Sequence, residues 1–160
     1  MIYRVIWGNL APESFQVNKN TKDKARYKMK PTGITFYPKT CTALLQVDPR
    51  SVESITSKLD GTEVAEGLDK KKEFHITLIG YETGEWIMER IGKMKNATLE
   101  DILPQIEGIV MGMNWSFEVT GQIHEISERC STRETRRSLI VKVNLPKIVE
   151  LHRSLTKMIG

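Results

Sequence analysis

The sequence predicts an α+β fold in which antiparallel or mixed sheets line a cleft and helices cover the outside. Segments in which apolar and polar residues alternate, the period of a half-buried strand, are followed by segments whose apolar residues recur at helical spacing. Apolar residues make up 39% of the 160 residues and charged residues 28%. This balance is typical of a globular chain and excludes a collagen, a long disordered segment or a coiled-coil rod.

Residues 1–38 differ in composition from the rest, so we expect a basic N-terminal extension over 1–38 and a main domain over 39–160. Short apolar runs predict strands at 2–7 and 34–37. Between them, six basic residues fall within twelve positions: Lys19, Lys22, Lys24, Arg26, Lys28 and Lys30. Only Asp23 opposes these charges. The segment is either a solvated loop or an arm that contacts phosphate groups.

The main domain is expected to open with a buried strand at 42–47, because this compact apolar run is bounded by Pro38 and Asp48. Asp48 can cap a helix over 49–59, whose first residue is a proline with a backbone angle already suited to a helix. Gly61 is expected to end this helix.

The next strand is predicted at 73–80 from its strict alternation. One face carries Phe74, Ile76 and Leu78, and the other carries His75 and Thr77. We expect the apolar face to join the core and the polar face to line an open, basic cleft.

Two helices are predicted after this strand. Thr83 can cap the first, whose apolar residues are Ile87, Ile91 and Met94. Thr98 and Asp101 have the spacing of a capping box at the start of the second. Pro104 is expected to kink or restart that helix, because proline lacks the backbone N–H that a helix interior uses.

The last part of the chain is predicted to be a hairpin and a helix. A long half-buried strand at 115–126 leads through a polar, arginine-rich connection at 127–137 to a strand at 138–143. Asn144 can cap the final helix, at 146–159.

These elements form a weak internal repeat. The strand at 42–47, a proline-containing turn and a helix recur as the strand at 138–143, an Asn-Leu-Pro turn and a helix. In the first copy the helix is followed by the strand with His75 and Thr77. In the second copy the given sequence stops at Gly160, before the corresponding strand.

Charge and cysteine usage narrow the class of protein. Lysine and arginine number 24 against 20 acids, for a net charge of +4, which permits a polyanionic partner without requiring one. Cys41 and Cys130 have no metal-ligand spacing, which favours reduced thiols in a cytoplasmic protein. No apolar run approaches the ~20 residues of a membrane span, and the N-terminus lacks the pattern of a signal peptide. We therefore expect no membrane association.

The strand at 73–80 carries the strongest candidate for catalysis. His75 and Thr77 lie on the same face, about 6.8 Å apart along the strand. The imidazole can transfer a proton while the hydroxyl donates a hydrogen bond to a phosphoryl oxygen.

The segment Phe74 to Leu78, within this strand–helix–strand unit, resembles the two-histidine (2H) phosphoesterase superfamily. That group includes RNA 2′,3′-cyclic phosphodiesterases and 2′–5′ RNA ligase-like proteins. The resemblance covers roughly residues 40–160. It implies two pseudo-symmetric lobes, each with one His-x-Thr or His-x-Ser strand, and metal-free acid–base catalysis without a cofactor. His75 and Thr77 would be the first catalytic pair, and the second lobe is incomplete in this sequence.

The sequence departs from the family pattern because it has no second His-x-Thr motif. His124 is followed by Glu125 and Ile126, so it has no hydroxyl residue two positions later. His152 has Ser154 at that position, but both lie on a predicted helix, where residues i and i+2 do not share a face. Three explanations remain open: a longer chain continues past Gly160, the protein binds without cleaving, or a second subunit supplies the missing half.

Four residues from separate segments complete the candidate site as substrate-binding residues: Lys24, Lys72, His124 and Arg136. The resemblance implies a metal-independent phosphodiesterase or RNA-end processing enzyme that acts on 2′,3′-cyclic phosphates or related RNA or nucleotide phosphodiesters. The alternative is a catalytically degenerate RNA- or nucleotide-binding module with the same fold. A third reading is an interaction protein in which the His-x-Thr sequence is accidental.

Overall fold

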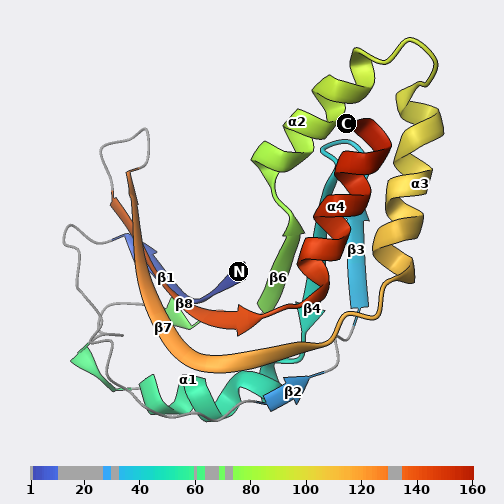
Figure 1. Cartoon of the computed structure of the whole chain (residues 1–160). Helices are drawn as coiled ribbons and strands as arrows, with labels where there is room; N and C mark the ends of the chain where they lie inside the picture. Colours follow the sequence, from blue (N-terminus) through green and yellow to red (C-terminus); the bar gives the residue numbers. More distant parts are fainter. Residues whose placement is uncertain are drawn as a thin grey trace.

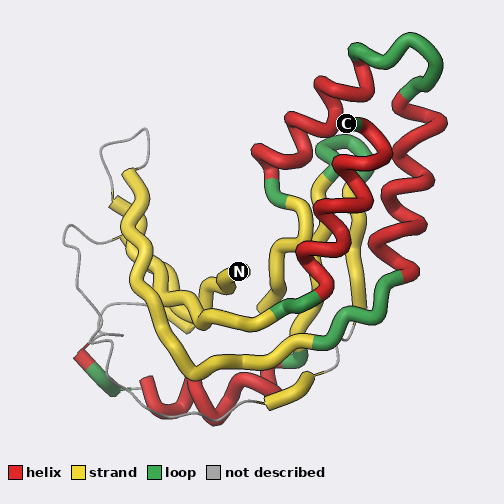
Figure 2. Tube along the Cα trace, in the orientation of Figure 1, coloured by secondary structure: helices red, strands yellow, loops and turns green. Residues whose placement is uncertain are grey.

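A computed structural model of the chain describes residues 2–10, 27–29, 33–59, 61–63, 69–70, 74–129 and 135–160. Within these residues the chain forms two antiparallel sheets and four α-helices. The predicted α+β class is therefore confirmed. Figure 1 shows the order of the elements along the chain, and Figure 2 shows helices gathered on one side of the molecule.

The smaller sheet has three antiparallel strands. In spatial order they are β3 (Gly33–Tyr37), β4 (Thr42–Val47) and β6 (Phe74–Ile79). A 3-10 helix (Pro49–Val52) and α1 (Glu53–Leu59) follow β4. The side chain of Asp48 accepts a hydrogen bond from the backbone N–H of Arg50, 2.9 Å away. This confirms the predicted cap.

The larger sheet has five antiparallel strands. In spatial order they are β2 (Tyr27–Met29), β7 (Phe117–Arg129), β8 (Thr135–Asn144), β1 (Ile2–Leu10) and β5 (Asp69–Lys70). The strands β1 and β3, both from residues 1–38, pair with strands of the main domain. β1 also runs beside β6, so the two sheets meet there.

A layer of three helices covers one face of the smaller sheet. The helices are α2 (Tyr81–Gly92), α3 (Leu99–Gly112) and α4 (Lys147–Ile159). They pack against one another, α2 lies against β4, and α3 lies against β3. Their inward side chains join those of the sheet in one core, which includes Ile87, Ile106, Leu151, Leu45 and Ile76.

The helix starts confirm one predicted cap and correct two. Thr98 and Asp101 form the capping box at the start of α3. By contrast, the N-cap residue of α2 is Gly80 rather than Thr83, and that of α4 is Pro146 rather than Asn144. Neither of these two helices has a side-chain cap. α3 also continues through Pro104 as one helix, because tertiary packing outweighs the loss of one internal hydrogen bond.

The hairpin of β7 and β8 is longer than the sequence predicts. The predicted connection at 127–137 is partly strand, because β7 extends to Arg129 and β8 starts at Thr135. The pairing shifts register between Val119 and Ile123, which is the kind of irregularity that bends a strand. In Figure 1 the hairpin curves away from the helical layer, so the two parts form the arms of a U.

Candidate functional site

β6 sends its side chains to opposite faces of the smaller sheet. Phe74, Ile76 and Leu78 are at most 3% exposed and belong to the core shared with the helices. His75 and Thr77 are half-buried and point to the other face. The predicted orientation of both sets is confirmed.

The neighbouring strand extends the polar face. In the antiparallel register, Gln46 of β4 lies opposite His75, and Leu44 lies opposite Thr77. Directly opposed residues share a face of the sheet, so the side chains of these four residues are neighbours. His75 and Thr77 are therefore held by two paired strands whose other face is fixed in the core.

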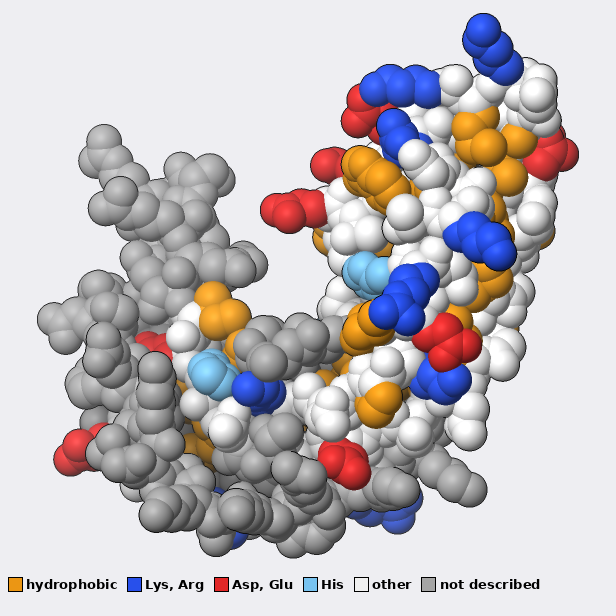
Figure 3. All heavy atoms as spheres, in the orientation of Figure 1, with side chains coloured by type: hydrophobic (Ala, Val, Ile, Leu, Met, Phe, Trp, Pro, Cys, Tyr) orange, Lys and Arg blue, Asp and Glu red, His pale blue; other side chains and the backbone are white. Residues whose placement is uncertain are grey.

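A pocket of about 670 Å³ opens on this face. Its lining comes from β3, β4, β6, the turn between β3 and β4, and the start of α2. The lining residues are Tyr37, Pro38, Lys39, Thr40, Thr42, Leu44, His75, Thr77, Ile79, Gly80 and Tyr81. Its volume lies in the range of small-molecule sites, ~300–1,000 Å³. Figure 3 shows one face of the molecule, on which an open gap separates the helical part from the larger sheet; no residue of the larger sheet is among the described residues that line the pocket.

The charge in the pocket is positive. Of the described residues that line it, only Lys39 carries a permanent charge, and this side chain is exposed. The basic cleft stays a prediction, because a single exposed lysine is the one cationic side chain among the described lining residues. The start of α2 also borders the pocket, and its backbone N–H groups carry the partial positive charge of a helix N-terminus. Glu82, exposed in the first turn of α2, opposes part of this field.

Three threonine hydroxyl groups add to the polar lining of the pocket. Thr40, Thr42 and Thr77 all line the pocket, and the Oγ1 atoms of Thr40 and Thr42 are 2.8 Å apart. Each hydroxyl has one proton and two lone pairs, so the pair keeps one proton and several lone pairs for a bound oxygen. Together with the histidine and the lysine, these groups can bind an oxyanion and exchange a proton with it.

Two exposed tyrosines stand at the rim. Tyr37 is 46% exposed and Tyr81 is 72% exposed, and both line the pocket. Phe36, the neighbour of Tyr37, is 9% exposed and belongs to the core. No sequence pattern indicated Tyr81, Lys39 or the Thr40–Thr42 pair as part of the site. The Pro38 turn was a signal for an exposed loop there, but nothing local indicated that this loop meets β6.

The other predicted site residues lie apart from this pocket or outside the described residues. His124 is half-buried on β7, opposite Ile140 of β8, and does not line the pocket. Arg136 is placed by its backbone on β8, opposite Glu128. Lys24 and Lys72 are outside the described residues. His152, the third histidine, is exposed on α4.

The described residues contain neither a metal-binding cluster nor a candidate membrane span. In these parts of the chain, no group of three or more histidine, cysteine or acidic side chains could hold a metal ion. No helix among them combines the length and the apolar character that crossing a membrane requires.

Comparison of the chain with protein-family models, with curated proteins and with solved structures found no match.

Proposed function

We propose that this chain binds a phosphodiester of RNA or of a nucleotide in the pocket beside β6 and promotes its hydrolysis by metal-independent acid–base catalysis. A 2′,3′-cyclic phosphate at an RNA end is the proposed substrate. One observation carries the proposal: His75 and Thr77 line the same pocket as Lys39, on a strand whose opposite face is buried.

The roles follow from the chemistry of each group. Hydrolysis of a cyclic phosphate needs a proton removed from the attacking water and a proton delivered to the departing ribose oxygen. His75 can perform one of these transfers. Thr77 can donate a hydrogen bond to a non-bridging oxygen, and the ammonium group of Lys39 can offset the negative charge.

The topology supports a two-unit architecture of the 2H type. The hairpin of β3 and β4 leads into the helical segment 49–59, and the hairpin of β7 and β8 leads into α4. A third antiparallel strand lies next to the second strand of each hairpin: β6 beside β4, and β1 beside β8. By this correspondence, β1 occupies the position in the second unit that the strand with His75 occupies in the first.

A second candidate function is binding without cleavage. The observation that favours it is that the described lining of the pocket contains one histidine, His75. A site with one proton-transfer group retains its affinity for a phosphate ester while losing most of its rate, because each positioned transfer contributes roughly 10²–10⁴-fold.

An assay of the chain with a short RNA that ends in a 2′,3′-cyclic phosphate, in the presence of EDTA, tests the proposal. If the chain cleaves, His75→Ala should lower kcat by about 10²–10⁴-fold. His152→Ala is the matched control, since His152 is exposed on α4 away from the pocket lining, and should have the wild-type rate. Saturable binding without turnover would favour the binding module. Cleavage that survives in His75→Ala would contradict the proposed role of His75.

A further inference from the structure

The turn between β3 and β4 has an unusual backbone. The backbone N–H of Thr40 donates to the carbonyl of Tyr37 at 3.3 Å, closing a turn in which Pro38 occupies the position that proline favours. Cys41, the last residue of the turn, has a φ of 51°. A residue with a side chain rarely adopts this left-handed conformation, which has a steric cost. The surrounding structure must therefore hold the turn in place.

Helix α2 is the element that holds it. Gly84 lies so close to the turn that a Cβ atom there would be 2.3 Å from the carbonyl oxygen of Thr40 and 2.9 Å from that of Cys41. Both obstacles are backbone atoms, which cannot rotate out of the way as a flexible side chain does. Any larger residue at position 84 would therefore push the turn and the helix apart.

The turn and the strand that follows it carry a large part of the pocket wall. Lys39 and Thr40 belong to the turn, and Thr42 begins β4. Thr42 is only 7% exposed, although its hydroxyl is paired with that of Thr40 on the pocket lining. The position of these three polar groups relative to His75 thus depends on how closely α2 approaches the turn.

We propose that this turn is a preorganised oxyanion-binding wall, and that Gly84 is the positioning residue that sets it against His75 and Thr77. The wall offers an ammonium group and two hydroxyl groups to the oxygens of a phosphate ester. This inference rests on the proposed function for its ligand, whereas the positioning by Gly84 stands on the geometry alone.

Gly84→Ala tests the positioning without a ligand. Cys41 is buried, and burial raises the pKa of its thiol to about 11, so it should react slowly with an aromatic disulfide reagent. In a Cys130→Ser background, Gly84→Ala should increase the labelling rate of Cys41 at least tenfold. Gly92→Ala is the matched control, because it lies in the same helix and a Cβ there meets nothing within 4 Å. An unchanged rate in a folded Gly84→Ala protein would overturn the positioning role.

Binding of a nucleoside 3′-monophosphate, compared with inorganic phosphate, tests the wall. Gly84→Ala should weaken the affinity for both probes at least tenfold, and Gly92→Ala less than twofold. The far-UV circular dichroism spectrum should stay unchanged, which loss of overall structure would not allow. If Gly84→Ala fails to fold, Thr42→Val tests the oxyanion-binding wall instead, because valine lacks the hydroxyl group and has nearly the same shape as threonine. It should weaken binding about fivefold, with Thr156→Val on α4 as its control.

The outcomes separate the two proposals. If the wild-type chain binds neither probe, the proposed function and the oxyanion wall are both wrong, while the labelling of Cys41 still decides whether Gly84 positions the turn. If the wild type binds and His75→Ala weakens binding, but Gly84→Ala and Thr42→Val do not, the wall is wrong and the proposed function stands.

Discussion

At the scale of residues, the pocket combines a histidine, a lysine and three threonine hydroxyls on a rigid support. His75 and Thr77 are fixed because their neighbours Phe74, Ile76 and Leu78 are buried on the opposite face. A strand with one buried face cannot slip by one residue without exposing its core side chains. The orientation of the two polar groups is therefore enforced by the hydrophobic core.

Thr77 offers a test of this arrangement at a single atom. Thr77→Val removes the hydroxyl and keeps the branched shape, so the fold should be retained while a hydrogen bond to the phosphate is lost. Such a bond to a charged group contributes about 1.5–3 kcal/mol, so affinity for a nucleoside 3′-monophosphate should fall roughly 10- to 150-fold, by the tenfold-per-1.4 conversion. Thr77→Ser, which keeps the hydroxyl, should remain within a few-fold of wild type in the same titration. Equal losses in both variants would show that the hydroxyl is not the contact.

The sequence was sufficient to predict which residues of β6 face outward, because alternation is a local pattern. It could not predict that Lys39 and Tyr81 line the same pocket as His75. Those residues come from β3–β4 and from α2, and the contact between the elements depends on Gly84, whose role is visible only once α2 lies on the turn.

At the scale of elements, α3 shows how a local motif fixes a helix start. The backbone N–H of Asp101 donates to Thr98 Oγ1 at 3.3 Å, and the backbone N–H of Thr98 donates to Asp101 Oδ2 at 2.9 Å. These hydrogen bonds satisfy donors that the first turn of a helix leaves unpaired. The pKa of the Asp101 carboxyl group is lowered because the Thr98 hydroxyl donates to Oδ2 at 2.7 Å and the Thr98 backbone N–H donates to the same oxygen.

The pH dependence of stability follows from that shift. Because the folded pKa is below the unfolded value of about 3.9, the Asp101 carboxylate stabilises the fold above pH ~4, and the contribution disappears as the pH falls through the folded pKa. Asp101→Asn should lower the free energy of unfolding at pH 7 and leave a smaller difference from wild type at pH 2–3. Chemical denaturation at both pH values measures this. Glu100→Gln, exposed in the same turn, is the control, and an equal effect of both substitutions would contradict the capping role.

The element boundaries divide into those with local signals and those without. Thr98 and Asp48 cap helices as their sequence contexts indicate. Asn144 does not, because the helix start is displaced to Pro146, where the backbone N–H of Ile148 donates to the carbonyl of Leu145 at 3.1 Å. The polar sequence at 127–137 predicted a connection, but part of it belongs to β7 and β8. Strand pairing uses backbone hydrogen bonds, so polar residues can extend a hairpin beyond the core.

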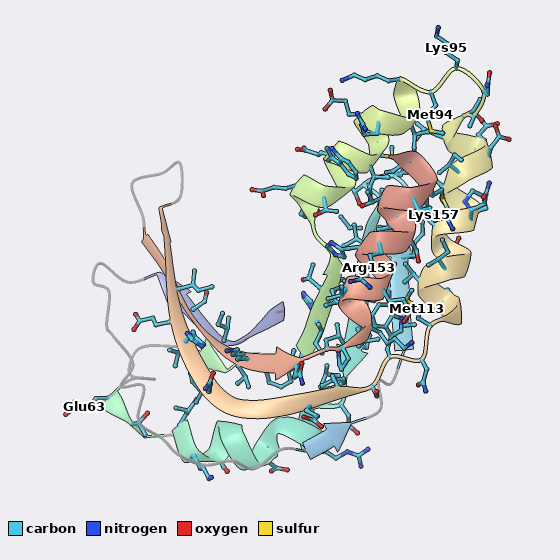
Figure 4. All side chains as sticks on the ribbon, viewed as in Figure 1. Glu63, Met94, Lys95, Met113, Arg153 and Lys157 are labelled. Carbon is cyan, nitrogen blue, oxygen red and sulfur yellow. The ribbon has the colours of Figure 1, made fainter. Side chains whose placement is uncertain are left out.

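At the scale of the whole molecule, the two halves of the chain are interdependent. The pocket belongs to the sheet of β3, β4 and β6, yet one of the helices in the layer behind that sheet, α4, comes from the C-terminal part of the chain. α4 buries Leu151, Leu155 and Ile159 in the shared core. Its outer side carries Arg153 and Lys157, which Figure 4 labels. This interleaving of distant segments is a tertiary property that no local pattern could predict.

Shortening a buried side chain of α4 should therefore destabilise the whole fold. Leu151 is fully buried, and Leu151→Ala should lower the free energy of unfolding by about 2–5 kcal/mol, as is usual for such a truncation in a packed core. Val149→Ala, on the same helix at 54% exposure, should change it by less than about 0.5 kcal/mol. Urea denaturation followed by tryptophan fluorescence measures both variants. A loss below 1 kcal/mol for Leu151→Ala would show that α4 is not integral to the core.

The central claim, that the pocket beside β6 binds a phosphate ester, is tested most directly by a titration of the isotope-labelled chain with a nucleoside 3′-monophosphate, followed by amide and imidazole NMR signals. The account predicts saturable shifts at His75, Thr77, Lys39 and Thr40, with those of His152 unmoved. Saturable shifts centred on His124 and the β7–β8 hairpin, with His75 unmoved, would contradict it.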